Sequence, residues 1–145
     1  MRIAVALVRI AMGVMLVAAG ALKIGHAPTL AAAIAGFRLL PSPVVAPLSI
    51  GLPFLEVFVG LYLIVGFYAR TAAYVATAQY LLYAFAIASA VIRGIPANCG
   101  CFGPGDAATA DWPHVAFDLA LGALCAFVAW RAPGAFALDE RLNTR

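Results

Sequence analysis

Charged residues are scarce in this 145-residue sequence. They make up 10% of the chain, whereas hydrophobic residues make up 66%. Soluble domains are roughly half apolar and about a quarter charged. A chain of this length has room for one domain, and a soluble domain of this size could not bury so much apolar surface. The composition therefore excludes an ordinary soluble fold and predicts that lipid surrounds much of the chain.

The sequence also lacks clusters of basic residues, repeats and cysteine-rich motifs. The net charge is +3, but the lysines and arginines occur singly, which excludes the basic stripe of a typical nucleic-acid-binding protein. There is no internal repeat and no low-complexity tract. Only three cysteines occur, and two of them form the one closely spaced pair. Because structural zinc takes four ligands, this pair alone cannot form such a site.

Four apolar stretches reach the roughly 20 residues that a helix needs to cross a bilayer. In lipid a segment of this length satisfies its backbone groups only as a helix, and the many alanines and glycines within the stretches suit close helix packing. We predict an all-α integral membrane four-helix bundle with spans at about 3–22, 44–67, 71–92 and 112–131. The bundle would form one domain over residues 1–135, followed by a polar and frayed cytoplasmic tail at 136–145.

A shorter apolar segment separates the first two predicted spans. Its side chains at Leu30, Ile34, Phe37 and Leu40 recur at helical spacing, and Thr29 can cap a helix at its start. We predict a short interfacial helix on the outer leaflet. It is interpreted as a lid over the bundle, with a docking surface as the alternative.

The distribution of lysine and arginine predicts the orientation, because cytoplasmic loops carry an excess of both. One side of the bundle would hold Arg2, Arg70, Arg131, Arg141 and Arg145, and the other Lys23, Arg38 and Arg93. We therefore predict a multi-pass protein of the cell inner (cytoplasmic) membrane with both termini in the cytoplasm. The loop between the last two spans would lie outside, in an oxidising compartment where cysteine pairs normally form disulfides.

That outer loop contains the most informative element, Cys99-Gly100-Cys101. In an extended chain the two Cα atoms lie near the upper limit for a disulfide, roughly 7 Å, and Gly100 can adopt the positive φ that tightens the turn. A bridge in so small a ring is strained and therefore easily reduced. Short loops gain little stability from a bridge, so the spacing favours thiol–disulfide exchange. A structural bridge and soft-metal binding, such as Cu(I), are the alternatives.

The remaining cysteine, Cys125, lies within the fourth span and is interpreted as a small buried apolar residue. One cysteine pair cannot relay electrons within the chain. Exchange at Cys99 and Cys101 therefore needs a partner protein, a quinone or another acceptor. No cofactor follows from the sequence, and a quinone is one candidate electron acceptor.

Three ionisable residues fall within the predicted spans, namely Arg9, Glu56 and Asp118. Such residues are costly in lipid and usually face the bundle interior or a wet cavity. Glu56 is interpreted either as a packing group paired with Arg9 or as a proton-handling group beneath the cysteine loop. Asp118 lies about one turn into the fourth span.

Lys23 ends the first span on the outer side. A cation beside the thiols would favour the thiolate, although a lysine at this position can equally extend to the interface. His26 and His114 are interpreted as interfacial or capping residues, and they would join a metal site only if the fold brought them together.

Several segments together resemble the MauE/DoxX-like family of four-span membrane proteins. They are Ala19–Lys23, Phe37–Pro41, Leu52–Glu56 with Gly60, Arg93–Gly94, Cys99–Gly103, and Trp112 with Asp118. The Cys-Gly-Cys-Phe-Gly element at 99–103 is the most specific and points to the MauE side. The sequence departs from the family pattern at Phe117, where an arginine often precedes the aspartate, so an ion-pair role for Asp118 does not carry over.

The resemblance implies a role in maturing the small, disulfide-rich subunit of methylamine dehydrogenase, alongside a periplasmic thioredoxin-like protein. From residues and resemblance together we predict a membrane thiol–disulfide exchange factor that acts on an exported disulfide-containing client. Cys99 and Cys101 would form the redox pair, with Lys23, Glu56 and Asp118 in supporting roles. A copper-handling or small-molecule transporter and a non-catalytic scaffold are the alternative functions.

Overall fold

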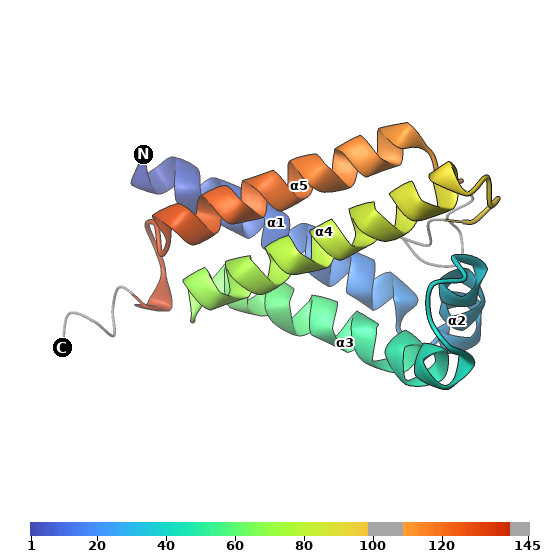
Figure 1. Ribbon diagram of the computed structural model, residues 1–145. Coiled ribbons are helices and arrows are strands. Elements are labelled where there is room, and N and C mark those ends of the chain that lie inside the picture. The colour runs from blue at the N-terminus through green and yellow to red at the C-terminus, as the bar shows by residue number, and fades with distance from the viewer. Residues whose placement is uncertain (99–108, 140–145) are drawn as a thin grey trace.

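The computed structural model describes residues 1–98 and 109–139, which form five helices (Figure 1). The helices are α1 (Arg2–Lys23), α2 (Ala27–Gly36), α3 (Ser42–Val65), α4 (Ala69–Ile92) and α5 (Trp112–Arg131). All except α2 are long and apolar enough to cross a membrane. The predicted four-helix membrane bundle is confirmed, and the span boundaries differ from the predicted ones by at most two residues.

Large apolar side chains point outward from the four long helices. Leu7 on α1, Phe58 on α3, Leu82 on α4 and Trp130 on α5 are each more than half exposed, at 65%, 58%, 66% and 70%. Contiguous apolar surface on this scale is rare on soluble monomers. The outer face of the bundle is therefore built to contact lipid, while the core combines small and polar residues with apolar side chains such as Leu16, Leu63 and Ile87.

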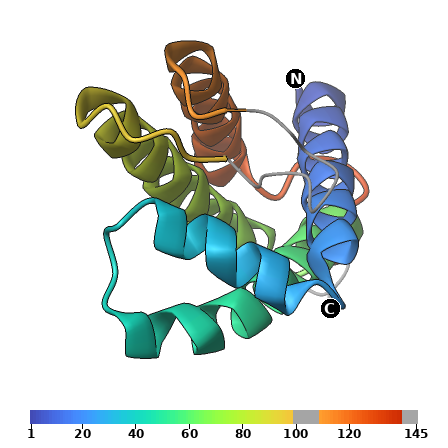
Figure 2. The same cartoon turned by 90° about the vertical axis from the view of Figure 1, so that its right-hand side faces the viewer.

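The bundle has two unlike ends (Figure 1). At the terminal end, the N-terminus meets the segment after α5, where the Ala135 N–H donates to the Arg2 carbonyl at 3.1 Å. At the opposite loop end, α2 lies across the helices (Figure 2). There, Asn98 and Thr109 form an isolated antiparallel bridge, and the Ala110 N–H donates to the Ala97 carbonyl at 2.8 Å. The residues between Asn98 and Thr109 lie outside the described part of the chain.

Three glycines allow α1 and α3 to pack backbone against backbone. A Cβ atom added at Gly13 would lie 2.7 Å from the Gly60 carbonyl oxygen, and one added at Gly60 would lie 2.6 Å from that of Gly13. Two turns nearer the loop end, a Cβ at Gly20 would lie 2.6 Å from the Pro53 carbonyl oxygen. These contacts hold the antiparallel register of α1 and α3, as expected for small residues at helix interfaces in lipid.

Alanine has the corresponding role between α4 and α5. Ala72, Ala73 and Ala76 on α4 and Ala129 on α5 are at most 4% exposed and belong to one core cluster. Cys125 lies in the same cluster and is 1% exposed, which agrees with its interpretation as a small buried residue. The small side chains let these helices approach closely at this end, while Tyr80 and Leu81 of α4 pack against the Gly122 position of α5.

The segment after α5 is not frayed at its start, which corrects the prediction for the tail. Ala137 is buried, and the Asp139 carboxylate accepts hydrogen bonds from the backbone N–H groups of Tyr68 (2.8 Å) and Ala69 (2.9 Å). Asp139 thus caps the N-terminus of α4, where unpaired N–H groups favour an anion. Gly66, with φ of 73°, ends α3 beside Ala137. Residues 140–145 of the predicted tail lie outside the described part.

The short helix predicted between the first two spans is present, but it starts and ends earlier than expected. Pro28 lies in the first turn of α2 and His26 is the N-cap residue, so Thr29 does not cap the helix. Proline is accepted there because its missing N–H would have no helical partner. Of the predicted apolar face, Leu30 and Phe37 are buried, whereas Leu40 beyond the helix is 43% exposed.

The close α1–α3 contact leads to a test of stability. Gly60→Ala places a Cβ against the backbone of α1, so we expect a lower melting temperature and a loss of about 1–3 kcal/mol in the free energy of unfolding. Gly51→Ala is the matched control in the same helix, because a Cβ there meets nothing within 4 Å. Thermal unfolding of the detergent-solubilised variants measures both, and equal stability of the two would refute the close contact.

Candidate functional site

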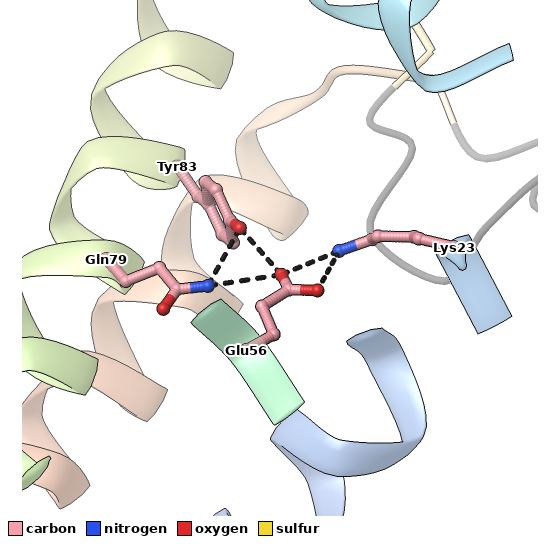
Figure 3. A network of polar contacts seen from close by, with 4 residues as sticks. All are labelled: Lys23, Glu56, Gln79 and Tyr83. Carbon is pink, nitrogen blue, oxygen red and sulfur yellow. Dashed lines mark hydrogen bonds and ion pairs between the residues drawn. The ribbon is translucent and has the colours of Figure 1, made fainter. Parts of the chain in front are cut away.

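A buried ion pair between α1 and α3 forms the centre of the candidate site. The Lys23 ammonium lies 2.7 Å from Glu56 Oε1 and 2.9 Å from Glu56 Oε2 (Figure 3). The two side chains are only 3% and 1% exposed. A buried charge needs a close partner, because the interior cannot replace the water that the charge loses. Each residue therefore makes the burial of the other tolerable.

Two side chains from α4 complete the hydrogen bonding of Glu56. The Tyr83 hydroxyl donates to Glu56 Oε1 at 2.6 Å, and Gln79 Nε2 donates to the same oxygen at 3.1 Å (Figure 3). Gln79 Nε2 also lies 2.9 Å from the Tyr83 hydroxyl, and the Lys23 ammonium lies 5.6 Å from the centre of the Tyr83 ring. The network therefore ties α1, α3 and α4 together.

Helix geometry explains how Lys23 reaches Glu56. A Cβ at Gly20 would lie 2.6 Å from the Pro53 carbonyl oxygen and 3.0 Å from Glu56 Cβ, so Gly20 packs against the turn from Pro53 to Glu56. Lys23 is one turn nearer the loop end, roughly 5 Å along the bundle axis from Gly20. Side chains in a helix tilt toward its N-terminus. Since α1 and α3 are antiparallel, Lys23 and Glu56 tilt toward each other and close the gap.

The ion pair forms part of the wall of a partly open cavity of about 380 Å³. Apolar or aromatic side chains make up most of the wall, and a few polar groups interrupt it. The lining residues are Met15, Leu16, Ala19, Lys23, Glu56, Tyr80, Tyr83, Pro113, His114, Phe117, Asp118 and Leu121. The cavity thus lies mainly between α1 and α5, with α4 and Glu56 behind it.

Asp118 lines the same cavity from α5. Its side chain is 4% exposed, and its Oδ2 atom accepts no hydrogen bond from the described part of the chain. Native proteins rarely leave a buried oxygen of this kind without a partner. The structure therefore brings the three predicted supporting residues, Lys23, Glu56 and Asp118, to one cavity, and Asp118 has hydrogen-bonding capacity left over.

The loop end of the cavity is formed by the start of α5. Asp111 is the N-cap residue, and its carboxylate accepts from the His114 backbone N–H at 2.9 Å and lies 2.6 Å from His114 Nδ1. The hydrogen bond from the His114 backbone contributes most, and the bond to its ring contributes next. Together they hold the pKa of Asp111 below its ordinary value. His114 does lie at the start of a helix, as its interpretation as a capping residue suggests, but it also lines the cavity.

The proposed pairing of Glu56 with Arg9 is wrong. Arg9 lies at the terminal end, where its Nη2 atom donates to the Ala135 carbonyl at 3.3 Å. It packs so closely against Gly66 that a Cβ there would strike the guanidinium. Residue type and depth alone suggested the pairing, but Arg9 is four residues on the terminal side of Gly13, whereas Glu56 is four residues on the loop side of Gly60. The antiparallel register therefore separates them.

The predicted redox residues, Cys99 and Cys101, lie outside the described residues. Their attachment points are described, however. Asn98 precedes Cys99 and is bridged to Thr109, and Ala97 shares a buried cluster with Val115 of α5. Both ends of the loop are thus held beside the first turn of α5, which contains the cavity residues Pro113 and His114.

Sequence reasoning missed Gln79 and Tyr83 as members of the site. Their spacing of four residues places them on one face of α4, and Gln79 is the one side-chain amide in that span. That combination was an available signal for a partner of Glu56. The identity of the partner still required the register between α3 and α4, which no local pattern contains.

Comparisons with known proteins agree on one family. The family model described as "Methylamine utilisation protein MauE" matches residues 1–131. A protein named methylamine utilization protein MauE from Methylorubrum extorquens is 38% identical over 123 residues, which cover 83% of this chain and 66% of the relative. A protein of the same name from Paracoccus denitrificans is 33% identical over 128 residues, covering 88% and 69%.

The chain thus spans about two thirds of the length of these curated relatives. No solved structure matches it significantly. The family match includes every residue of the ion-pair network and the cavity, as well as the cysteine loop.

The buried ion pair predicts a difference between a single and a double substitution. Lys23→Met leaves Glu56 without its cation, so we expect a loss of about 3–5 kcal/mol in the free energy of unfolding. Lys23→Met combined with Glu56→Gln should recover most of that loss, because neither residue of the pair then carries a charge. Arg38→Met, which removes an exposed cation at the same end, is the control. Thermal unfolding measures all three, and a double variant no more stable than Lys23→Met would contradict the pairing.

Proposed function

The chain belongs to the family of methylamine utilisation protein MauE, and on this premise we propose that it is a membrane thiol–disulfide exchange factor for exported proteins. Cys99 and Cys101 are its redox pair. The observation that carries the proposal is the Cys-Gly-Cys element in a loop whose two ends are bridged at Asn98 and Thr109, next to the cavity that Lys23, Glu56 and Asp118 line.

The exchange chemistry follows from the spacing of the two cysteines. A thiolate of the reduced pair attacks a disulfide of the partner, and a mixed disulfide forms while one partner sulfur leaves as a thiol. The second cysteine then attacks the mixed disulfide and releases the partner as a dithiol. Two electrons pass from the pair to the partner in this direction, and the reverse sequence passes them back.

The partner and the client are assigned by chemistry and by the family. We propose a periplasmic thioredoxin-like protein as the direct partner and an exported protein with several disulfides as the client. The names of the relatives refer to methylamine utilisation, so the client proposed is a disulfide-rich component of that pathway.

Lys23, Glu56 and Asp118 support the pair from the cavity rather than from the loop itself. The charges of Lys23 and Glu56 compensate each other at 2.7 Å, so this ion pair keeps polar groups stable within the membrane. Asp118 retains an oxygen that no described residue satisfies. These groups can accept or deliver the protons that accompany a change between dithiol and disulfide.

The proposed orientation places the loop end outside the inner membrane and the terminal end in the cytoplasm. The described basic residues Arg2, Arg70 and Arg131 lie at the ends of helices that meet the terminal end. The sequence adds Arg141 and Arg145 after α5, which gives five basic residues against the three of the other side, Lys23, Arg38 and Arg93. Such an excess is typical of the cytoplasmic face. An outer loop end would expose Cys99 and Cys101 to an oxidising compartment.

Single cysteine substitutions should trap the exchange intermediate. Cys99→Ser and Cys101→Ser are each expected to abolish turnover with a thioredoxin-like partner, and one of the two should accumulate a mixed disulfide, because no second thiol resolves it. Non-reducing electrophoresis and mass spectrometry of alkylated peptides detect that product. Cys125→Ser is the matched control and should retain wild-type exchange, since Cys125 is 1% exposed within the core.

Two results would overturn this function. A pair that stays reduced under oxidising conditions and binds Cu(I) tightly would favour copper handling. If the client assembles normally in cells that carry both Cys99→Ser and Cys101→Ser, the protein is a scaffold and not an exchange factor.

Orientation is tested separately, by labelling intact cells with a membrane-impermeant thiol reagent. In a background without native cysteines, a cysteine at position 98 should label and one at position 70 should not. The opposite labelling pattern would reverse the proposed orientation.

A further inference from the structure

We propose that the cavity between α1 and α5 binds the ring of a lipid-soluble para-quinone, and that this quinone is the oxidant for the cysteine pair. The binding site rests on the described residues alone. The oxidation step rests, in addition, on the proposed function of Cys99 and Cys101.

The cavity is accessible from the lipid. Its lining runs from Met15 to Lys23 on α1 and from Pro113 to Leu121 on α5, so on each helix it extends over nine residues, a rise of roughly 12 Å. Both helices are membrane spans. Phe117, on the rim of the cavity, is 47% exposed on the surface that faces lipid. A ligand dissolved in the bilayer can therefore enter between α1 and α5, whereas a polar solute would first have to leave water.

The wall selects a flat and largely apolar ligand. Tyr80, Tyr83 and Phe117 contribute aromatic rings, and Met15, Leu16 and Leu121 contribute aliphatic surface. Ring-to-ring contacts and contacts between sulfur and aromatic rings are favourable in such a site. The volume of about 380 Å³ is near the lower end of the range of small-molecule sites, which suits a single substituted ring.

The charges in the wall favour a neutral ligand. A cationic ligand would be repelled by the Lys23 ammonium. An anionic ligand would be repelled by the carboxyl groups of Glu56 and Asp118. Because Lys23 and Glu56 already compensate each other, neither kind of ion would gain enough to offset the loss of its hydration. A neutral quinone loses little hydration and still has two oxygens that accept hydrogen bonds.

Two polar groups have hydrogen-bonding capacity for those oxygens. The Lys23 ammonium has three N–H donors, and the described contacts use two of them on Glu56. Asp118 is 4% exposed, and its Oδ2 atom has no partner among the described residues. In its acid form Asp118 supplies an O–H donor. A para-quinone has its oxygens at opposite edges of the ring, so one can face Lys23 on α1 and the other Asp118 on α5.

The oxidation step balances without a further reactant. The two S–H bonds of Cys99 and Cys101 break and one S–S bond forms. The two electrons pass to the quinone, the two protons end on its oxygens, and the product is a hydroquinone. The hydroquinone leaves into the bilayer, where it is reoxidised by other enzymes that use quinones. The protein would thus introduce disulfides rather than reduce them.

Binding can be measured without any cysteine chemistry. In a Cys99→Ser/Cys101→Ser background, Trp130→Phe leaves Trp112, which precedes the cavity residue Pro113, as the one fluorescent tryptophan. Titration with a short-chain ubiquinone analogue should quench Trp112 to saturation. The matched background with Trp112→Phe reports on Trp130 at the far end of α5, and it should show only the linear quenching caused by quinone dissolved in the detergent micelle.

Substitutions in the wall locate the ligand. Ala19→Leu fills the cavity and should weaken binding at least about tenfold, whereas Ala18→Leu, on the neighbouring exposed position, should leave it unchanged. Asp118→Leu removes the donor and should weaken binding about tenfold, the effect of one lost buried hydrogen bond. Asp118→Asn keeps a donor and should bind nearly as well as wild type. Melting temperatures identify any variant that fails to fold. If an Asp118 variant fails to fold, the comparison of Ala18→Leu with Ala19→Leu still tests the site.

Three outcomes would overturn the proposal. They are unsaturable quenching of Trp112, equal binding by the Ala18→Leu and Ala19→Leu variants, and equal binding of an alkyl alcohol that lacks the ring. If the quinone binds but the native cysteine pair exchanges with no partner, the proposed function fails while the binding site stands. If exchange occurs and the quinone does not bind, the site fails while the function stands.

Discussion

The ion pair between Lys23 and Glu56 is the contact around which the rest of this bundle is arranged. A charge in the interior of a membrane bundle requires a partner at close range. Here the partner is on a different helix, so α1 and α3 must keep a register in which the two side chains meet at 2.7 Å. The glycine contacts at Gly13, Gly20 and Gly60 provide that register. Tyr83 and Gln79 then determine which face α4 presents to Glu56.

The same arrangement creates the cavity. The hydrogen-bonded side chains of α1, α3 and α4 fill only part of the space behind α5. Ala19 on α1 and Asp118 on α5 line the space that remains. The result is a site with apolar walls and a few oriented polar groups within reach of lipid. Its loop end is formed by Pro113 and His114, close to the bridged ends of the cysteine loop. In the proposed function and ligand site, a membrane-soluble oxidant approaches from the bilayer and an exported thiol protein approaches from water.

The fold was largely predictable from the sequence, because hydrophobic length alone identifies a transmembrane helix. The four spans were predicted to within two residues. The site was predictable only in its composition. Glu56 and Asp118 were identified because ionisable residues are rare within spans, and Lys23 because it is a cation that ends the first span on the side of the cysteine loop. The pairing of Glu56 with Arg9 was wrong, since pairing depends on helix register rather than on residue type. Gln79, Tyr83 and the return of Asp139 to cap α4 depend on contacts between distant segments, and such contacts have no local signature.

The most direct test of the whole account is the stoichiometry of oxidation in a lipid bilayer. Protein reduced at Cys99 and Cys101 is reconstituted into liposomes that contain a ubiquinone analogue, without oxygen, and both hydroquinone and disulfide are quantified over time. We expect one hydroquinone for each Cys99–Cys101 disulfide formed. Ala19→Leu should suppress both products, and Ala18→Leu should leave both unchanged. Disulfide formation that proceeds at the same rate without quinone, or that yields no hydroquinone, would contradict it.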